Sequence, residues 1–386
     1  MKKICFFTGT RAEYGLLMPL LEKIKKEKSF VLQLIVSGSH LSHEFGFTYK
    51  EIENDGFIIN KKIEILLSSD TPIGVSKAMG LGFISYAEAI NELKPDLMVI
   101  LGDRYESFAA ASVCLILNVP VVHLYGGELT EGAFDDSLRH AITKIAHLHF
   151  TSTEEYRNRV IQLGENPEFV FNVGAIGLDN IKRMKLLSKI EFEKSIGFKL
   201  KKKNIIVTFH PVTLEKQNSE KQFKNLLDAI DELDDTGIIF TKPNADNGGR
   251  EIISMIDKYV SKNSDRAVCF ASLGQLRYLS ALKYVDAVVG NSSSGIIEAP
   301  SFKIGTINIG DRQKGRIKTD SIIECDYDLK SIKVALKKLY SESFQNLLKK
   351  INSPYGEGDS AKKIIKVLKK VDLSLIYPKK FYDIKR

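Results

Sequence analysis

The segment 290–298, with the sequence Gly-Asn-Ser-Ser-Ser-Gly-Ile-Ile-Glu, has residue types that suit a phosphate ligand. Its two glycines let a ligand approach the backbone, its three serines supply hydroxyl donors, and free amides at the start of a helix attract negative charge. Glu298, one helical turn further on, can accept hydrogen bonds from a ribose diol. Taken alone, the pattern also fits a serine N-cap on an ordinary helix.

Six further polar motifs follow short apolar runs, at the places where buried strands would end. They are 9–14 (Gly-Thr-Arg-Ala-Glu-Tyr), 102–104 (Gly-Asp-Arg), 123–128, 210–213, 242–246 (which includes Asn244) and 310–316. None is a G-x-G-x-x-G dinucleotide fingerprint or a G-x-x-x-x-G-K-[ST] phosphate loop. The sequence therefore disfavours NAD and ATP, and we expect no cofactor. His40 and His43 lack an identifiable third ligand, so we expect no metal either.

The candidate acid/base residues lie in the first half of the chain, and most of the candidate phosphate-binding residues lie in the second. The first half carries four carboxylates, Asp103, Glu128, Asp135 and Asp136. Paired carboxylates with different pKa values can act as base and acid toward carbon-bound protons. This division suggests a sugar nucleotide, with its sugar at the acids and its diphosphate held by Arg11, Ser292, Ser293 and Arg312.

Short apolar runs alternate with helical patterns and so predict the elements that position these motifs. We expect strands at 3–8, 31–37, 96–101, 119–124 and 149–152, and a second set at 204–209, 237–241, 267–271, 286–289 and 306–309. Such alternation predicts an α/β fold with two Rossmann-like, doubly wound parallel-sheet domains and an interdomain cleft. We place the first domain at 1–180 and the second at 181–365, with the C-terminal helix and tail, about 366–386, packing back on the first.

Length and composition agree with a soluble two-domain enzyme. The 386 residues exceed what one hydrophobic core usually supports. The net charge of +8 is spread over lysine-rich helix faces without interleaved aromatic residues, so we expect no nucleic-acid partner. No apolar run approaches the ~18 residues of a membrane span, and no signal peptide is evident. We expect a cytoplasmic homodimer or homotetramer that does not bind membranes.

Together the motifs resemble the hydrolysing UDP-N-acetylglucosamine 2-epimerases of sialic-acid and legionaminic-acid biosynthesis. The resemblance rests on five motifs in the family's order, at 102–104, 123–128 (His-x-x-Gly-Gly-Glu), 135–144, 210–213 (His-Pro-Val-Thr) and 290–295. It implies two Rossmann-like domains in the GT-B arrangement and no NAD. It also implies elimination of UDP across C1 and C2 to a 2-acetamidoglucal, followed by hydration to free N-acetylmannosamine.

The resemblance also implies roles for individual residues. It places Arg11, His210, Ser292, Ser293 and Arg312 at the diphosphate and its surroundings, with His210 also among the catalytic groups, and Glu298 at the ribose. Separately, we expect Asn244 to bind the substrate or its UDP group. Asp103, Glu128 and Asp135 or Asp136 form the acid/base group, supported by Arg104 and Arg139. Some relatives carry a glutamate at the position of Tyr125, which leaves proton transfer here to Glu128 and the Asp135–Asp136 pair.

Two alternative functions remain open from the sequence. A GT-B glycosyltransferase would use the same nucleotide site but would need an acceptor, and a non-catalytic sensor would only bind the sugar nucleotide. The sugar is also open, because related enzymes act on UDP-GlcNAc or on 2,4-diacetamido-2,4,6-trideoxy sugars carried on UDP or GDP.

Overall fold

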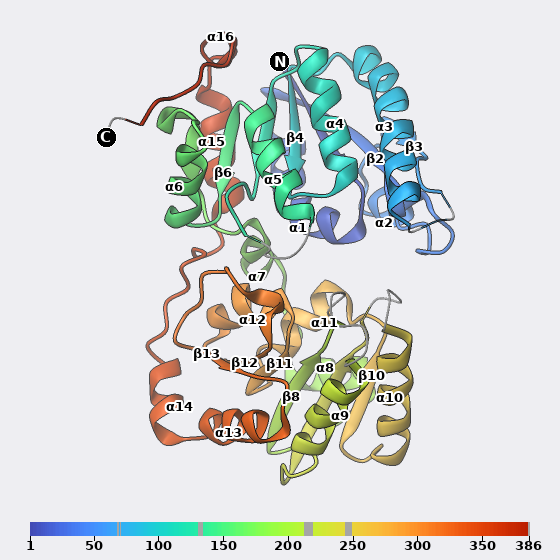
Figure 1. The fold of residues 1–386 in the computed structure, drawn as a ribbon, viewed down its shortest axis with the longest axis vertical. Coiled ribbons are helices and arrows are strands. Elements are labelled where there is room, and N and C mark those ends of the chain that lie inside the picture. The colour runs from blue at the N-terminus through green and yellow to red at the C-terminus, as the bar shows by residue number, and fades with distance from the viewer. Residues whose placement is uncertain (68, 70, 130–133, 212–218, 244–248, 385–386) are drawn as a thin grey trace. The chain divides into compact units, whose positions relative to one another are not determined.

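The computed structural model describes residues 1–67, 69, 71–129, 134–211, 219–243 and 249–384. The chain forms two compact units (Figure 1). Unit 1 contains Met1–Arg183 and Tyr355–Arg386, and unit 2 contains Met184–Pro354.

Unit 1 is built on a seven-stranded parallel sheet with the order β3-β2-β1-β4-β5-β6-β7. Its strands are β1 (Lys2–Thr8), β2 (Phe30–Ser37), β3 (Lys61–Ile63), β4 (Leu97–Leu101), β5 (Val121–Leu124), β6 (Leu148–Thr151) and β7 (Val170–Asn172). Its helices are α1 (Arg11–Lys26), α2 (Tyr49–Asn54), α3 (Pro72–Leu93), α4 (Tyr105–Ile116), α5 (Phe134–Ile145), α6 (Glu154–Gln162), α7 (Asp179–Arg183), α15 (Ser360–Lys370) and α16 (Leu373–Ile376).

Side chains of β1 alternate between two hydrophobic cores, as the period of a strand requires. Ile4 and Phe6 join the core that includes residues of α1 and α15. Cys5 and Phe7 join the core that includes residues of α3 and α4. The sheet is therefore covered on both faces, which explains why its strands are near-continuous apolar runs.

Unit 2 is built on a six-stranded parallel sheet with the order β10-β9-β8-β11-β12-β13. Its strands are β8 (Lys203–Thr208), β9 (Thr236–Thr241), β10 (Ala267–Phe270), β11 (Ala287–Gly290), β12 (Gly305–Ile309) and β13 (Ile322–Cys325). Its helices are α8 (Lys189–Ile196), α9 (Ser219–Ile230), α10 (Gly249–Lys262), α11 (Gly274–Ala281), α12 (Ser293–Ile297), α13 (Leu329–Leu339) and α14 (Glu342–Leu348). One core joins the sheet to α9, α10 and α13.

The predicted fold class of two doubly wound parallel sheets is confirmed, and each predicted strand is present within two residues of its expected bounds. Three strands, β3, β7 and β13, were not predicted. All three lie at sheet edges and are three or four residues long. An edge strand buries fewer side chains and tolerates polar residues such as Lys61 and Lys62, so its pattern is weak.

The chain returns to unit 1 at Tyr355, rather than near residue 365. Asp179 fixes this return, because its carboxylate accepts hydrogen bonds from the amides of Ser360 and Ala361, both at 2.9 Å. Both amides belong to the first turn of α15, where backbone donors lack partners within the helix. The whole of α15, including the residues assigned by sequence to the second domain, therefore packs on unit 1.

No helix among the residues that the structure describes combines the length and the apolar character needed to cross a membrane.

We predict that Asp179→Ala will destabilise unit 1 markedly. The substitution leaves two buried amides without an acceptor, at ~1–3 kcal/mol each. Asp328→Ala removes an exposed cap of α13 and serves as the control, with an expected loss of about 1 kcal/mol. Urea unfolding followed by circular dichroism measures both losses, and equal losses would contradict the assignment of Asp179.

Candidate active site

In each sheet the strand order reverses once, and the predicted motifs follow the strands at that point. The reversal lies between β1 and β4 in unit 1, and between β8 and β11 in unit 2. Ligands of doubly wound folds bind outside the carboxyl ends of the strands at such switch points. Gly9 and Asp103 follow β1 and β4, whereas His210 and Asn291 follow β8 and β11. Each unit therefore presents polar residues where its topology favours a ligand.

An ion pair between a buried arginine and a partly exposed aspartate organises the acidic residues of unit 1. Arg139 on α5 is 4% exposed, and its Nη2 donates to Oδ2 of Asp103, which follows β4. Its Nη1 lies 3.8 Å from Oδ1 of Asp136, in the first turn of the same helix. The structure thus brings together three of the predicted residues.

Asp135 stands beside this group and has an unusual proton affinity. Burial, together with the negative charge of Asp103, raises the pKa of Asp135 to about 6, although Arg104 and Arg139 partly oppose the shift. A carboxyl group with this pKa exchanges its proton near neutrality. It can therefore act as a base or as an acid, as the sequence predicts for this pair.

Arg104 is bonded to one buried carboxylate and lies near a second, and sequence reasoning missed both. Its Nε and Nη2 donate to the two carboxylate oxygens of Glu106 at 3.1 and 2.8 Å. Burial raises the pKa of Glu13 to about 7, although Arg104 opposes the shift, and Glu13 accepts hydrogen bonds from the amides of Gly9 and Thr10. The available signals were Glu106 in the first turn of α4 and the capping box of Thr10 and Glu13.

Glu128 and Arg11 lie in different surroundings. Glu128 is buried and accepts a hydrogen bond from Ser152 Oγ at 2.9 Å, after the ends of β5 and β6. Arg11 is half exposed and forms an ion pair with Glu51 of α2 at 3.2 Å. The hydroxyl of Tyr125 accepts a hydrogen bond from the amide of Gly177 at 3.2 Å.

His123 supports the strand end that carries Asp103. It is fully buried, and its Nε2 lies 2.8 Å from the carbonyl oxygen of Gly102. A carbonyl only accepts, so Nε2 carries the proton, and Nδ1 faces the hydroxyl of Thr143 on α5 at 3.1 Å. Burial lowers the pKa of His123 to about 3, so the ring stays neutral at pH 7.

Asn291 joins the predicted residues of unit 2 and was not itself predicted. Its side chain bonds the amide and the carbonyl of His210, at 2.7 and 2.8 Å. The backbone carbonyl oxygen of Asn291 accepts hydrogen bonds from Arg312 and Gln313, both at 2.9 Å. Asn291 is fully buried. Asn291 belongs to the serine motif at 290–298, but nothing in the sequence indicates that it contacts His210, Arg312 or Gln313.

The serine motif forms a short hydrogen-bonded turn. Ser292 is the N-cap of α12, as the simpler interpretation predicted, and α12 spans only Ser293–Ile297. Tyr278 donates to Ser294 Oγ at 2.6 Å, and the Ser294 hydroxyl bonds Glu298. Burial raises the pKa of Glu298, with the Ser294 bond and the charge of Arg316 opposing the shift. Ser294 therefore connects the serine turn to the carboxyl group of Glu298.

Positive charge is concentrated near this turn. Burial lowers the pKa of Arg312, and the nearby charge of Arg316 lowers it further. Burial and the charge of Arg312 lower the pKa of His210 to about 4, so its imidazole is neutral at pH 7. Gly290 has φ +131°, and a Cβ there would lie 2.0 Å from the Thr208 carbonyl oxygen. Close-packed backbone and two guanidinium groups are suited to an anion.

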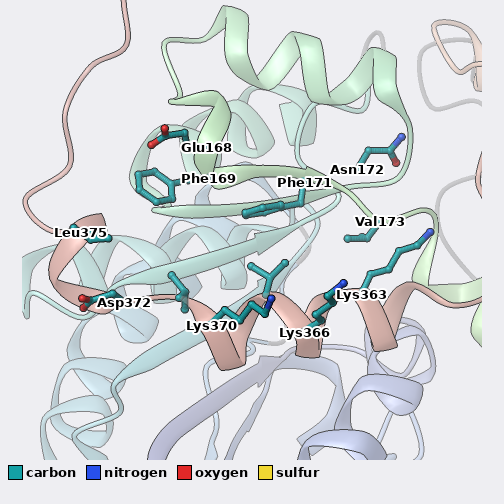
Figure 2. Close-up of a pocket in the computed structure, with 12 residues that line it drawn as sticks. Glu168, Phe169, Phe171, Asn172, Val173, Lys363, Lys366, Lys370, Asp372 and Leu375 are labelled. Atoms are coloured by element: carbon teal, nitrogen blue, oxygen red, sulfur yellow. The ribbon is translucent and has the colours of Figure 1, made fainter.

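Some predicted features lie elsewhere. Asn244 lies outside the described residues. His40 is buried between the hydroxyls of Thr8 and Thr48, at 3.1 and 2.8 Å, and so is structural. A pocket of about 470 Å³ lies between β7 and α15, where Phe169 and Phe171 face the lysine-bearing helix (Figure 2). None of the predicted site residues lines it.

The family model described as UDP-N-acetylglucosamine 2-epimerase matches residues 22–369. The chain therefore belongs to the UDP-N-acetylglucosamine 2-epimerase family, and the resemblance to that family is confirmed.

Two curated relatives and one solved structure are similar over almost the whole chain. GDP/UDP-N,N'-diacetylbacillosamine 2-epimerase (hydrolyzing) from Campylobacter jejuni is 48% identical over 384 residues, 99% of both chains. UDP-N,N'-diacetylbacillosamine 2-epimerase (hydrolyzing) from Legionella pneumophila is 35% identical, over 97% of both chains. The crystal structure of UDP-GlcNAc 2-epimerase from Neisseria meningitidis bound to UDP-GlcNAc has a TM-score of 0.83 and 16% identity. The similarity covers 96% of this chain and 100% of that one, so the fold is shared.

We predict that the free energy of unfolding decreases as the pH is lowered, partly because the buried ring of His123 resists protonation. The unfolded ring binds a proton near pH 6.5, whereas the folded ring does so near pH 3. The unfolded state therefore binds more protons between these values, which lowers the free energy of unfolding by up to ~1.4 kcal/mol per pH unit as pH falls. His123→Gln should show a shallower slope in urea unfolding between pH 6.5 and 4.

The exposed His43 supplies the control, because His43→Gln should leave the slope unchanged. Equal slopes in wild type and His123→Gln would contradict the neutral buried ring.

Proposed function

We propose that this chain is a hydrolysing 2-epimerase that converts a nucleotide-linked 2-acetamido sugar and water into a nucleoside diphosphate and the free C2-epimeric sugar. The observation that carries the proposal is the 48% identity, over 99% of both chains, to a relative named as a hydrolysing 2-epimerase. The acid group of unit 1 supports it, because both steps of the reaction move a proton at carbon.

The reaction divides into an anti elimination and a hydration. In the first step a base removes the proton on C2, the electron pair forms the C1–C2 double bond, and the C1–O bond breaks with its electrons going to the diphosphate. In the second step C2 takes up a proton on the opposite face and water adds to C1, with loss of its second proton. Asp103, Glu128, Asp135 and Asp136 are the candidates for these transfers.

The local environments suggest different duties within that set. Asp103 is held in place by the Arg139 guanidinium. Asp135, with a pKa of about 6, is the group that exchanges a proton most readily near neutrality. Arg104 supplies a positive charge for the sugar side of the substrate.

The nucleotide is assigned to unit 2 and to Arg11. Arg312, His210 and the Ser292–Ser293 pair would hold the diphosphate, and Glu298 would accept hydrogen bonds from the ribose. A diphosphate would offset the repulsion between Arg312 and Arg316. That Asn244 contacts the nucleotide stays a prediction. A homodimer or homotetramer in the cytoplasm stays a prediction.

For the sugar, we propose a 2,4-diacetamido-2,4,6-trideoxyhexose in preference to N-acetylglucosamine. Both curated relatives described above are named for N,N'-diacetylbacillosamine, one of them on GDP or UDP. The test is a panel of UDP-GlcNAc and the UDP and GDP derivatives of the trideoxy sugar, without acceptor, read by released nucleoside diphosphate. Faster release from a trideoxy derivative supports the proposal. If only UDP-GlcNAc is turned over, the proposed sugar is wrong. A requirement for an acceptor would indicate a glycosyltransferase, and binding without release of nucleoside diphosphate would indicate a sensor.

Replacing both Ser292 and Ser293 by alanine should weaken nucleoside diphosphate binding. Each lost hydrogen bond to a charged group is worth ~1.5–3 kcal/mol, so losing two should raise the dissociation constant by about 100-fold or more. Calorimetric titration of the full chain with UDP and with GDP measures the effect, and the exposed Ser301→Ala is the matched control. Unchanged affinity of the double variant for UDP and GDP would show that this turn does not bind the diphosphate.

The pH dependence of kcat/KM should reveal Asp135. If Asp135 is the base, only its ionised form works, so the rate should fall as pH drops through about 6. Asp135→Asn should lose most activity, and its residual rate should lack this inflection. A wild-type inflection that persists unchanged in the variant would assign the titration to another group.

Turnover in deuterium oxide should place one solvent deuteron at C2 of the product, since elimination removes the original C2 proton. Asp103→Asn, Glu128→Gln and Asp136→Asn should each lower kcat far more than they change KM, because they act on the chemical steps. A variant impaired in hydration should release the glycal, visible by mass spectrometry. Product without deuterium at C2 would rule out elimination, and full activity in all three variants would show that other carboxylates act.

A further inference from the structure

The C-terminal segment contacts the far end of the helix that carries the acids. Lys379 Nζ lies 2.6 Å from the carbonyl oxygens of Lys144 and Ala146, and 3.3 Å from that of Thr143. These carbonyls belong to the last turn of α5 and the residues that follow it, where backbone acceptors lack partners within the helix. A cation at this end is also favoured by the helix dipole. Lys379 thus closes the end of α5 opposite Asp135 and Asp136.

A buried carboxylate holds Lys379 in this position. Glu165 Oε2 lies 2.7 Å from Lys379 Nζ, and the other oxygen, Oε1, accepts from Lys144 at 2.7 Å. His149 Nε2 also lies 2.9 Å from Oε2. Burial alone would raise the pKa of Glu165, but His149, Lys379 and Lys144 outweigh it and hold the pKa at about 2. Glu165 is therefore ionised at neutral pH.

The backbone around Lys379 is anchored on both sides. Before it, the ring of Tyr377 stacks on His147 with 6.0 Å between centroids. After it, Phe381 packs against Gly164, where an added Cβ would lie 2.4 Å from the ring. The amide of Tyr382 donates to the Gly164 carbonyl at 2.9 Å. The segment is thus fixed to unit 1 by contacts independent of the lysine.

The far end of α5 is connected to the acids by a short series of contacts. Thr143, whose carbonyl faces Lys379, donates its hydroxyl to the Arg139 carbonyl at 3.1 Å and also faces His123. His123 donates to Gly102, the neighbour of Asp103, and Arg139 itself binds Asp103. A helix moves nearly as a rigid rod, so a shift at Thr143 is also a shift at Arg139 and at the first turn.

We propose that Lys379 is a positioning residue for the reaction, which holds α5 along its axis so that Arg139, Asp135 and Asp136 keep their places at the end of β4. Lys379 touches no reacting atom. The proposal rests on the proposed function for its catalytic consequence, whereas its structural part concerns α5 alone.

The test compares Lys379→Met, which keeps the apolar stem and removes the charge and donors, with Lys379→Arg, which keeps both. Lys380→Met is the matched control, because Lys380 is the adjacent, exposed lysine. We expect kcat of Lys379→Met to fall by about 10- to 100-fold, since a misplacement of ~1 Å can cost about 100-fold. KM should stay within about threefold, and Lys379→Arg should recover much of the loss.

Amide hydrogen exchange reports on α5 without any substrate. Peptides covering 134–145 should exchange faster in Lys379→Met than in wild type or Lys380→Met, while peptides of unit 2 should not change. Lys379→Gln provides a second variant should the methionine variant fail to fold.

Unchanged exchange in α5, a kcat equal to that of Lys380→Met, or a loss that Lys379→Arg does not recover would overturn the proposal. If the wild type releases no nucleoside diphosphate from any member of the sugar panel, the proposed function fails. The exchange comparison then still decides whether Lys379 holds α5.

Discussion

The ion pair between buried Arg139 and partly exposed Asp103 is the interaction on which the acid group of unit 1 depends. Removing the charge of Arg139 from water costs several kcal/mol, and close contact with a carboxylate offsets this cost. Asp103 stands at the end of β4 and Arg139 one turn into α5, so the pair sets the distance between sheet and helix. The contact of Thr143 with His123, and of His123 with Gly102, connects the same two elements a second time. The acids are therefore placed by the scaffold, before any substrate binds.

Unit 2 places its polar groups through an uncharged side chain. Asn291 presents both a donor and an acceptor, which allows it to bond the amide and the carbonyl of His210 at once. No acidic side chain could do this, since a carboxylate only accepts. The backbone carbonyl of Asn291 separately accepts a hydrogen bond from Arg312. The two units therefore differ in charge: arginines lie beside the acids of unit 1, whereas two arginines, Arg312 and Arg316, lie near each other in unit 2.

The fold class and most of the candidate residues were predictable from the sequence because they depend on local patterns. Apolar runs such as 97–101 are long enough to identify a buried strand, and a polar residue directly after such a run, such as Asp103, marks its carboxyl end. Glu13 and Glu106 were missed although their hydrogen-bond partners are local, because their burial depends on tertiary structure. Asn291 was missed because its partner His210 is distant in sequence. Glu106 is ordinary in a first helical turn until Arg104 is seen folded back on it. The early return at Tyr355 was missed for the same reason, because Asp179 and Ser360 are distant in sequence.

The return of the chain to unit 1 affects the order in which the protein can fold during synthesis. Ala361, Ile364 and Leu368 of α15 belong to the same core as Ile4 and Phe6 of β1. The ribosome adds about 5–20 residues per second, and domains generally fold as units as they emerge. Unit 2 is contiguous and can close as soon as Pro354 has emerged, while unit 1, although started first, still lacks one helix of its core. The part of the chain made first is thus completed last, and its unfinished apolar face has to wait through the synthesis of the whole second unit.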